Sequence, residues 1–494
     1  MSISQGNLPA FLSEQRHGHL IDGRMVPAQQ GDWVDSFSPA DGRLIAQLAR
    51  GREADVDLAV RAARRAFEGP WSRFTPAQRQ KLLIRVHDVI EQHFDEIVTI
   101  ESLDMGAPLT RLRGARNGLL QSILYFASQA HHAGGQTIPN SLAGRFTTMT
   151  IKAPVGVVGG IIPWNGPLFS QWGVIGAALA TGCTAVIKPA EDASLTVLRT
   201  AQLLLEAGVP EGVINVVTGL GSEAGAALAR HPDVNRLSFT GSTGTGREII
   251  KASAVNMKRL QLELGGKSPD IIFADADLDR AVPGAGMGVF GNSGQVCFAG
   301  TRIFVERKIQ EAFVERLAAF GRSLKVGHPL QEDVILGPLI SQRQLERVQG
   351  FVQQGSREGA QLVSGGERLG GDLAQGYYLE PTVFSEVHNS MAIAQEEIFG
   401  PVASVISFDT PEQALALANQ TEFGLGGAVW TSNIKTAMNM VHGIQAGTVW
   451  VNCYGAIDPA VGFGGVKNSG YGWKGGTTHI DGFLYQKAVV INTD

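Results

Sequence analysis

The sequence predicts a multidomain α/β protein that contains a doubly wound parallel sheet. At 494 residues the chain is too long for one compact core, so two or three domains are expected. Between residues 155 and 252, short apolar runs of strand length alternate with helix-like segments. Glycine is abundant, at 62 residues, and it clusters between apolar runs, where tight turns or close backbone approach to a ligand require it.

The first part of the chain is predicted to be helical. Residues 53–68 and 75–103 carry apolar side chains at helical intervals among charged ones. A more polar stretch, residues 134–150, separates this region from the central one.

The central region contains four predicted strands, VGVVGGII, TAVIK, VINVV and RLSF, with predicted helices at 168–179, 194–207 and 222–230 between them. This order and spacing favour right-handed crossovers and a parallel sheet. Ligands bind such sheets at the carboxyl ends of the strands. Here those ends read PWN, KPAE, TGLGSEAG and TGSTGTG.

A second α/β region begins at Glu263. Its predicted strands are DIIF, TRIFV and ASVISF, and its predicted helices span 309–324 and 411–418. The C-terminal LYQKAVVIN is a predicted strand whose open apolar edge favours subunit association.

Composition argues against several classes of protein. A net charge of -5 and scattered Lys and Arg are not typical of proteins that bind nucleic acids or anionic membranes. Residues 153–187 carry no charge, but prolines and glycines divide them into pieces too short to span a membrane. The polar N-terminal segment MSISQGNLPAFLSEQRHGHL lacks the apolar stretch of a signal peptide. We therefore expect a cytoplasmic protein.

The three cysteines are too few and too widely spaced for a disulfide framework or a zinc site, so we expect no metal. Cys183 and Cys453 lie in or beside apolar segments and are expected to be buried structural residues. Cys297 lies in NSGQVCFAG, whose small and polar residues predict an open turn. This context favours a reactive thiol, although a single cysteine is weak evidence for one.

Glu263 lies in QLELGGKSP, between Leu262 and Leu264 and just before two glycines. It is either an ordinary surface carboxylate or a partly buried one. Burial would raise its pKa and suit it to act as a general base near neutral pH.

Two glycine-rich loops, GLGSEAG (219–225) and GSTGTG (241–246), follow predicted strands and precede predicted helices. Free N–H groups at a helix N-terminus bind pyrophosphate, so the two loops together favour a dinucleotide, although neither fits G-x-G-x-x-G. Lys188 and Glu191 end another strand. They are either a solvated ion pair or ribose ligands, and a carboxylate there would favour NAD over NADP.

Together these segments resemble the NAD(P)-dependent aldehyde dehydrogenase superfamily over nearly the full length. The matching segments, in family order and spacing, are PWN (163–165), IKPAE (187–191), FTGSTGTG (239–246), LELGGKSP (262–269), GQVCFAG (294–300), EEIFGP (396–401) and FGGVKNSG (463–470).

The resemblance implies an aldehyde dehydrogenase-like fold with a doubly wound Rossmann-type domain. It would comprise an NAD-binding domain (1–131 and 152–262), an α/β catalytic domain (263–477) and a β oligomerisation arm (132–151 and 478–494). A homodimer or homotetramer is implied.

The resemblance also implies an oxidoreductase that converts an aldehyde to the carboxylic acid with NAD. Cys297 would attack the aldehyde, and hydride transfer would turn the thiohemiacetal into a thioester. The amide of Asn165 and the backbone N–H of Cys297 would form the oxyanion hole. Glu263 would activate the hydrolytic water and help to deprotonate Cys297.

Glu397 is implied to bind the nicotinamide-side ribose, with Phe399 packing near the ring. The full set of implied cofactor contacts is Ile162, Pro163, Trp164, Lys188, Glu191, Gly221, Gly225, Phe239, Thr240, Gly241, Ser242, Leu264, Glu397 and Phe399.

The substrate pocket is implied to be lined by Phe169, Ser170, Val296, Phe298, Tyr454 and Ile457. Gly166, Gly173 and Gly291 stand where bulky aromatic residues are common in the family, which indicates a roomy apolar site. We therefore expect a bulky aliphatic, terpenoid or aromatic aldehyde rather than a small charged one.

The sequence departs from the family pattern after FGGVKNSG. Many members carry a second glutamate where this chain has Trp473 and Lys474, and Gly462 replaces a frequent proline. The substitution argues against a second-carboxylate proton relay and places more of the base work on Glu263.

Two alternatives remain. A CoA-acylating enzyme of the same fold would transfer the acyl group to a thiol, but such enzymes generally lack a carboxylate at the position of Glu263. A non-catalytic binding or structural relative would not be expected to retain Cys297, Glu263 and Asn165 together.

Overall fold

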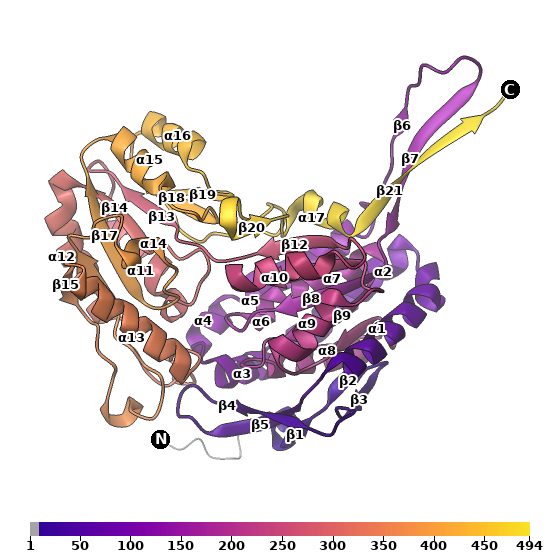
Figure 1. Cartoon of the computed structure of the whole chain (residues 1–494), viewed down its shortest axis with the longest axis horizontal. Coiled ribbons are helices and arrows are strands. Elements are labelled where there is room, and N and C mark those ends of the chain that lie inside the picture. Colours follow the sequence, from indigo (N-terminus) through magenta and orange to yellow (C-terminus); the bar gives the residue numbers. More distant parts are fainter. Residues whose placement is uncertain (1–8) are drawn as a thin grey trace.

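The computed structural model describes residues 9–494. Residues 1–8 lie outside the described part. They begin both the polar N-terminal segment discussed above and the implied NAD-binding domain. Figure 1 shows two α/β bodies side by side and a β arm that projects beyond them. In residues 9–494, no helix is both long and apolar enough to cross a membrane.

The first body is built on an eight-stranded sheet with the order β20-β12-β11-β8-β9-β10-β2-β3. Its five central strands are parallel. The chain passes from β8 to β9 and β10 on one side, then returns to β11 and β12 on the other, so the strand order reverses between β8 and β11. Such a reversal opens a crevice at the carboxyl ends of the strands. The five strands are β8 (Val157–Ile162), β9 (Thr184–Pro189), β10 (Ile214–Val216), β11 (Arg236–Thr240) and β12 (Arg259–Glu263).

Helices cover both faces of this sheet, as the doubly wound prediction requires. One face packs against α7 (Trp172–Thr181) and α8 (Leu195–Glu206), with α2 (Pro76–Gln92), α3 (Phe94–Met105) and α5 (Arg116–Gln129) in the same core. The other face packs against α1 (Glu53–Glu68), α9 (Ala226–Arg230) and α10 (Thr243–Ser253). The prediction of an α/β fold with a doubly wound sheet is confirmed.

The predicted helix at 53–68 is α1. The helical stretch predicted at 75–103 is two helices, because the chain turns at His93 between α2 and α3. Thr75 caps α2 by accepting from the backbone N–H of Gln78, whose side chain accepts in turn from the N–H of Thr75. At the sheet edges, β20 (Gly470–Tyr471), β2 (His19–Ile21) and β3 (Arg24–Val26) are antiparallel additions.

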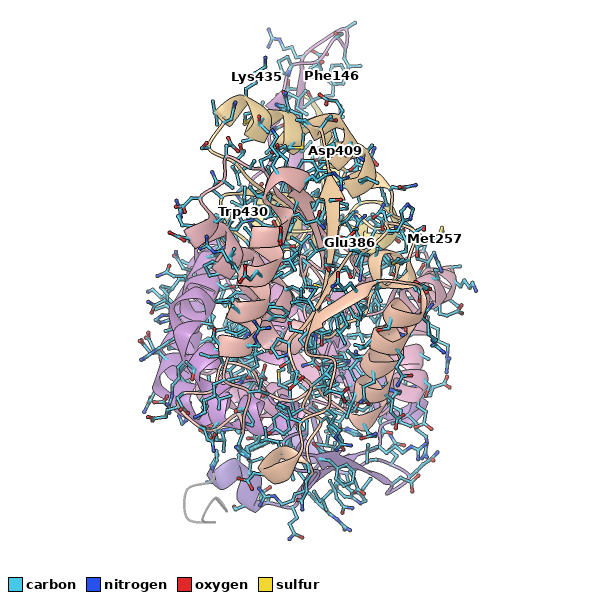
Figure 2. The ribbon with its side chains drawn as sticks, turned by 90° about the vertical axis from the view of Figure 1, so that its left-hand side faces the viewer. Phe146, Met257, Glu386, Asp409, Trp430 and Lys435 are labelled. Carbon is cyan, nitrogen blue, oxygen red and sulfur yellow. The ribbon has the colours of Figure 1, made fainter. Side chains whose placement is uncertain are left out.

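The second body is a seven-stranded sheet with the order β15-β16-β17-β14-β13-β18-β19. The predicted strands DIIF, TRIFV and ASVISF correspond to β13 (Pro269–Ile272), β14 (Arg302–Glu306) and β17 (Val402–Phe408). The predicted helices correspond to α12 (Gln310–Ser323) and α15 (Pro411–Asn419). The remaining strands are β15 (Gln361–Ser364), β16 (Thr382–Ser385), β18 (Gly426–Trp430) and β19 (Thr448–Val451). Trp430, which is labelled in Figure 2, ends β18, and its indole Nε1 donates to Asp270 Oδ1 at 2.8 Å.

The arm consists of β21 (Leu484–Asn492), β7 (Phe146–Pro154) and β6 (Thr137–Ile138). The strand β21 pairs with β7 along its whole length, from Leu484 opposite Pro154 to Asn492 opposite Phe146. Figures 1 and 2 show this ribbon extending beyond both bodies, with Phe146 near its tip. Because β21 lies at the edge of the sheet and exposes Val490 and Ile491, it has the open apolar edge that its sequence predicts. A further short sheet joins β1 (Arg16–His17), β5 (Leu44–Ala49) and β4 (Trp33–Phe37), in that order.

Candidate active site

Cys297 lies on a turn whose backbone takes an uncommon path. After α11 (Leu278–Phe290), the next turn η5 (Gly291–Gly294) places Asn292 and Ser293 at φ 54° and Gly294 at φ 72°. Three consecutive left-handed residues reverse the chain, and two of them are not glycine, so the surrounding contacts must hold them there. A Cβ on Gly294 would collide with the carbonyl of Gly400. The predicted turn at Cys297 is confirmed, and the cysteine is half-buried.

The contacts that hold this turn come from Ser293 and Gln295. Ser293 Oγ donates to the carbonyl of Gly337 at 2.7 Å. Gln295 Nε2 donates to the carbonyl of Asn292 at 3.2 Å, and its Oε1 accepts from the N–H of Ile340 at 2.8 Å. These bonds fix the backbone immediately before Cys297.

Asn165 follows β8 at the crevice where the strand order reverses. Its Nδ2 donates to the carbonyl of Gln295 at 2.9 Å, and its own carbonyl accepts from Asn292 Nδ2 at 3.1 Å. The amide of Asn165 is therefore held against the Cys297 turn, although 130 residues of chain separate Asn165 from Gln295. An amide nitrogen carries two donors, so this contact uses one of them.

Glu263 is the last residue of β12, and its side chain is buried. Gln261 Nε2 donates to its Oε1 at 3.0 Å, and within the described residues no partner contacts Oε2. Burial raises the pKa of Glu263 to about 8, although the Lys474 cation and the Gln261 hydrogen bond act to lower it. The surface-carboxylate interpretation is wrong, and this carboxyl group can exchange a proton near neutral pH.

The thiol of Cys297 is electrostatically linked to this carboxyl. Burial and, to a lesser extent, the neighbouring Glu263 and Glu397 carboxylates raise the pKa of Cys297 to about 12, while Lys474 acts to lower it. At neutral pH the thiol of the protein alone is protonated. An attack by sulfur therefore requires a nearby base, because the thiolate is the nucleophile.

The pair Gly265–Gly266 lets Glu397 approach the Cys297 turn closely. A Cβ on Gly265 would lie 2.7 Å from Glu397 Oε2, and one on Gly266 would collide with the carbonyl oxygen of Cys297. The N–H of Gly266 donates to Glu397 Oε1 at 3.1 Å. Burial raises the pKa of Glu397 to about 7, against the Gly266 hydrogen bond and Lys267, which lower it. Three segments distant in sequence thus meet at Cys297.

Lys188 and Glu191 lie at the carboxyl end of β9. Lys188 Nζ donates to Glu191 Oε2 at 2.8 Å, so the two residues form an ion pair; the lysine is almost completely buried, whereas Glu191 stays partly exposed. A Cβ on Gly221 would lie 3.8 Å from Glu191 Oε2, and one on Gly225 would lie 3.9 Å from Lys188 Cδ. These two glycines therefore keep the space beside the charged pair open.

The two glycine-rich loops differ in structure. The loop after β11 opens α10 as predicted, with Ser242 as the N-cap, its Oγ accepting from the N–H of Thr245 at 3.2 Å. The loop after β10 begins with a π-helical turn, η4 (Gly221–Gly225), before the short α9. Its start is therefore not the plain helix N-terminus that the sequence predicts.

The remaining cofactor candidates lie around the crevice. Ile162, Pro163 and Trp164 end or follow β8; Phe239, Thr240 and Gly241 end or follow β11; and Leu264 follows β12. The ring of Trp164 meets Phe399 edge-to-face with centroids 5.1 Å apart. Phe399 has φ 60°, so its backbone is strained where the second body reaches the first.

On the other side of Cys297, aromatic residues surround Phe298. Its ring lies 5.6 Å from Trp450 and 5.5 Å from Phe463, and its carbonyl accepts from the hydroxyl of Tyr454 at 2.6 Å. Phe169 and Ser170 lie in α6 (Pro167–Ser170), just after Asn165, while Val296 is half-buried and Ile457 is exposed.

The glycines near the Cys297 turn border open space. A Cβ on Gly166 would have no neighbour within 4 Å, and one on Gly291 would touch only Met287, at 3.8 Å. A Cβ on Gly173 would lie 3.6 Å from His479 and 3.7 Å from the Lys474 stem, so this glycine accommodates other side chains instead of leaving a void.

Sequence reasoning missed the positioning roles of Gln261 and Gln295. Gln261 could have been found, because residues two apart on a strand share one face. Gln295 gives no such signal, since its partners come from distant loops.

Cys183 is buried as expected, whereas Cys453 is exposed, so its expected burial is wrong. The chain leaves β19 at Val451 and turns at Asn452, with φ 53°, which carries Cys453 out of the sheet.

Known proteins are similar to this chain in sequence and in fold. Residues 25–489 match the model of the aldehyde dehydrogenase family. A mitochondrial benzaldehyde dehydrogenase of Antirrhinum majus is 42% identical over 95% of this chain and 88% of its own length. The structure of an aldehyde dehydrogenase from Bacillus cereus in an NAD+ complex is 43% identical, with a TM-score of 0.96 over 100% of this chain and 99% of that one. A betaine aldehyde dehydrogenase from Staphylococcus aureus, solved with NAD+, is 36% identical, with a TM-score of 0.96 over 99% of this chain and 97% of that one. The chain belongs to the aldehyde dehydrogenase family.

Proposed function

We propose that this protein oxidises an aldehyde to the carboxylic acid with NAD, through a thiohemiacetal and then a thioester on Cys297. The observation that carries the proposal is the meeting of Cys297, the Asn165 amide and the buried Glu263 at the carboxyl ends of β8 and β12. The NAD+ complex of the Bacillus cereus relative supports the choice of cofactor.

The residues around the crevice fit a dinucleotide. The buried Lys188 ammonium and the Glu191 carboxylate offer a donor and an acceptor to a ribose, and Gly221 and Gly225 leave room beside them. Glu397 offers a carboxylate to the second ribose, next to the Cys297 turn. When bound, NAD supplies a nicotinamide ring that accepts a hydride from the substrate carbon. The Glu191 carboxylate disfavours the 2′-phosphate of NADP.

In the acylation half, Glu263 takes the proton of Cys297, and the sulfur forms a bond to the aldehyde carbon. Asn165 and the backbone N–H of Cys297 donate to the resulting oxyanion, and each such donor contributes roughly 3–4 kcal/mol in hydrolases. Loss of the hydride leaves a thioester. Glu263 then releases the proton of Cys297 to solvent. In the hydrolytic half, the ionised Glu263 takes a proton from water, the new C–O bond forms, and the C–S bond breaks to release the carboxylic acid and leave the Cys297 sulfur as a thiolate that takes the proton back.

We also propose a role for each part of the chain. Residues 1–131 and 152–262 form the NAD-binding domain, and residues 263–477 form the catalytic domain. The arm, residues 132–151 and 478–494, joins subunits into a dimer or tetramer through the open edge of β21. The cytoplasm remains the expected compartment.

For the substrate we propose a bulky aliphatic, terpenoid or aromatic aldehyde. The open space at Gly166 and Gly291 supports it, as does the aromatic cluster around Phe298. The relatives include proteins named for benzaldehyde and for betaine aldehyde, so the name of a relative does not decide the substrate. Comparing kcat/KM for benzaldehyde, octanal, acetaldehyde and betaine aldehyde tests the proposal, and a clear preference for either small aldehyde contradicts it.

The central test replaces the sulfur. Cys297→Ala should abolish NADH formation with every aldehyde, while Cys453→Ala, which removes an exposed thiol, should retain it. Turnover in Cys297→Ala would refute the proposal.

Running the wild type with and without CoA separates hydrolysis from acyl transfer, because acyl-CoA as the product would identify the CoA-acylating alternative.

A further inference from the structure

Residues 463–474 fold over the carboxyl group of Glu263. Phe463 and Lys474 exchange two backbone hydrogen bonds of 2.7 Å, which closes the segment into a hairpin. Within it, β20 pairs with β12, placing Gly470 opposite Glu263. A Cβ on Gly464 would lie 3.4 Å from Glu263 Oε1, so the hairpin lies directly on the carboxyl.

The hairpin carries Lys474 into the site. Lys474 Nζ donates to Thr240 Oγ1 at 2.6 Å, and Thr240 is the registered neighbour of Glu263 on β11. The stem of Lys474 passes Gly173 on α7, where a Cβ would lie 3.7 Å from its Cδ. The ammonium is thus held one strand away from Glu263, in a position set by residues from three elements.

Three titratable groups from different parts of the fold lie near Lys474. Glu263 on β12 and Cys297 both act on its charge, and His479 lies beside the stem on α17 (Gly476–Gly482). Burial lowers the pKa of His479 to about 3, helped by the nearby Arg236 and Lys474 cations, so this imidazole is neutral. Lys474 therefore faces two acidic groups and a neutral imidazole.

We propose that Lys474 is a positioning residue whose ammonium lets Glu263 and Cys297 carry negative charge in the same buried site. The inference rests on the proposed function, in which Glu263 must be ionised to act as a base and Cys297 must be ionised to attack. Two acidic groups close together in a poorly solvated site suppress each other's ionisation. A cation held beside both offsets this effect without contacting the substrate.

The electrostatics agree with the geometry. Lys474 lowers the pKa of both Glu263 and Cys297. Burial lowers the pKa of Lys474 itself, and the two acidic groups act against this by raising it. A glutamate in place of Lys474 would add a third acid to the site and reverse the sign of this effect. The ionisation of Glu263 and Cys297 should therefore depend on Lys474.

The experiment measures ionisation without aldehyde or NAD. In a Cys453→Ala background, the rate of Cys297 alkylation by iodoacetamide is followed against pH. The deacylation rate with p-nitrophenyl acetate, which acylates the thiol directly, is followed in the same way. The variants are K474M, K474R and K474E, and K474Q replaces K474M if the latter does not fold.

K474M should move both pH profiles upward by about one pH unit or more, because each buried acid loses its cation. K474E should move them further, and K474R should keep them within a few tenths of a unit. Coincident profiles for K474M and the wild type would overturn the inference, as would a K474E variant that deacylates as fast as the wild type at neutral pH. If NADH formation does not require Cys297, the proposed function fails instead, and the alkylation profiles still report on Lys474.

Discussion

The carbonyl oxygen of Cys297 lies directly against the backbone of Gly266, with no room for a side chain between them. Gly266→Ala should therefore displace the Cys297 turn and lower kcat by about 100-fold, because small misplacements of a reacting group have effects of this size. Gly350→Ala, on an open helix position in α13 (Gln342–Arg357) with no neighbour within 4 Å, is the matched control and should retain full activity. Equal kcat values for the two variants would contradict the tight contact.

Glu263 should give thioester hydrolysis an acid limb. Burial raises its pKa to about 8, and only the ionised carboxylate accepts a proton from water, so the rate should fall as pH drops below that value. Glu263→Gln should abolish this limb and slow hydrolysis by roughly 100-fold or more, and it should also slow NADH formation in the first turnover, because the same carboxylate accepts the proton of Cys297. Rapid-quench kinetics between pH 5.5 and 9.5 measure both effects. Glu248→Gln, an exposed residue on α10, is the control, and a profile shared by both variants would exclude Glu263 as the base.

The sequence predicted the sheet well because its strands are fully buried. Runs such as TAVIK are buried on both faces and mostly apolar, since helices cover both sides of a parallel sheet, and this leaves a clear pattern. The helix boundary at His93 was missed, because the apolar period continues across it. The two-residue strands β1 (Arg16–His17) and β20 are too short to leave a period at all.

For the candidate site, the sequence motifs identified the reacting groups but not the residues that hold them in position. Cys297 and Glu263 were singled out from their glycine-rich surroundings, and the structure brings both to one place. The three left-handed residues before Cys297 could not be predicted, because their conformation depends on hydrogen bonds to Gly337 and Ile340, far along the chain. The position of Lys474 beside Glu263 likewise depends on tertiary folding, since 211 residues separate them.

Glu191 should control the choice between NAD and NADP. Glu191→Ser removes the carboxylate that disfavours a 2′-phosphate, so kcat/KM for NADP relative to NAD should rise by about tenfold or more. The measurement is NADH and NADPH formation with one aldehyde. Because Lys188 remains buried and loses its partner, a lower thermal midpoint is also expected. Glu223→Gln, in the loop after the neighbouring strand β10 and paired with Arg50, should leave the cofactor ratio unchanged. An unchanged ratio in Glu191→Ser would contradict the assigned contact.

Arg302 should be essential for stability at the start of β14. Its buried guanidinium donates to the backbone carbonyls of Lys267, Leu417 and Ala418 and so joins the GGKSP segment to α15. Arg302→Leu leaves these acceptors unpaired and should lower the free energy of unfolding by roughly 3–5 kcal/mol. Arg302→Lys should recover only part of this, because one ammonium cannot reproduce the planar fork. Thermal and denaturant unfolding measure the effect. Arg316→Ala, an exposed control, should change stability little, and similar losses in both would contradict the prediction.

Gly166 offers the sharpest test of a roomy substrate site. Its φ is 176°, outside the left-handed region, and a Cβ there would meet nothing within 4 Å, so the structure has space for the side chain of Gly166→Phe. The added ring follows Asn165 directly and should fill space near the Cys297 turn. We expect kcat/KM for benzaldehyde to fall by about tenfold or more relative to acetaldehyde, because the larger substrate needs the space that the ring would occupy. Gly118→Phe, at an exposed position in α5 that is also open, controls for the addition of a large apolar residue. A fall in kcat/KM that is equal for the two aldehydes would show that Gly166 does not border the path of the substrate. The open space beside it would then have no bearing on which aldehyde the protein oxidises.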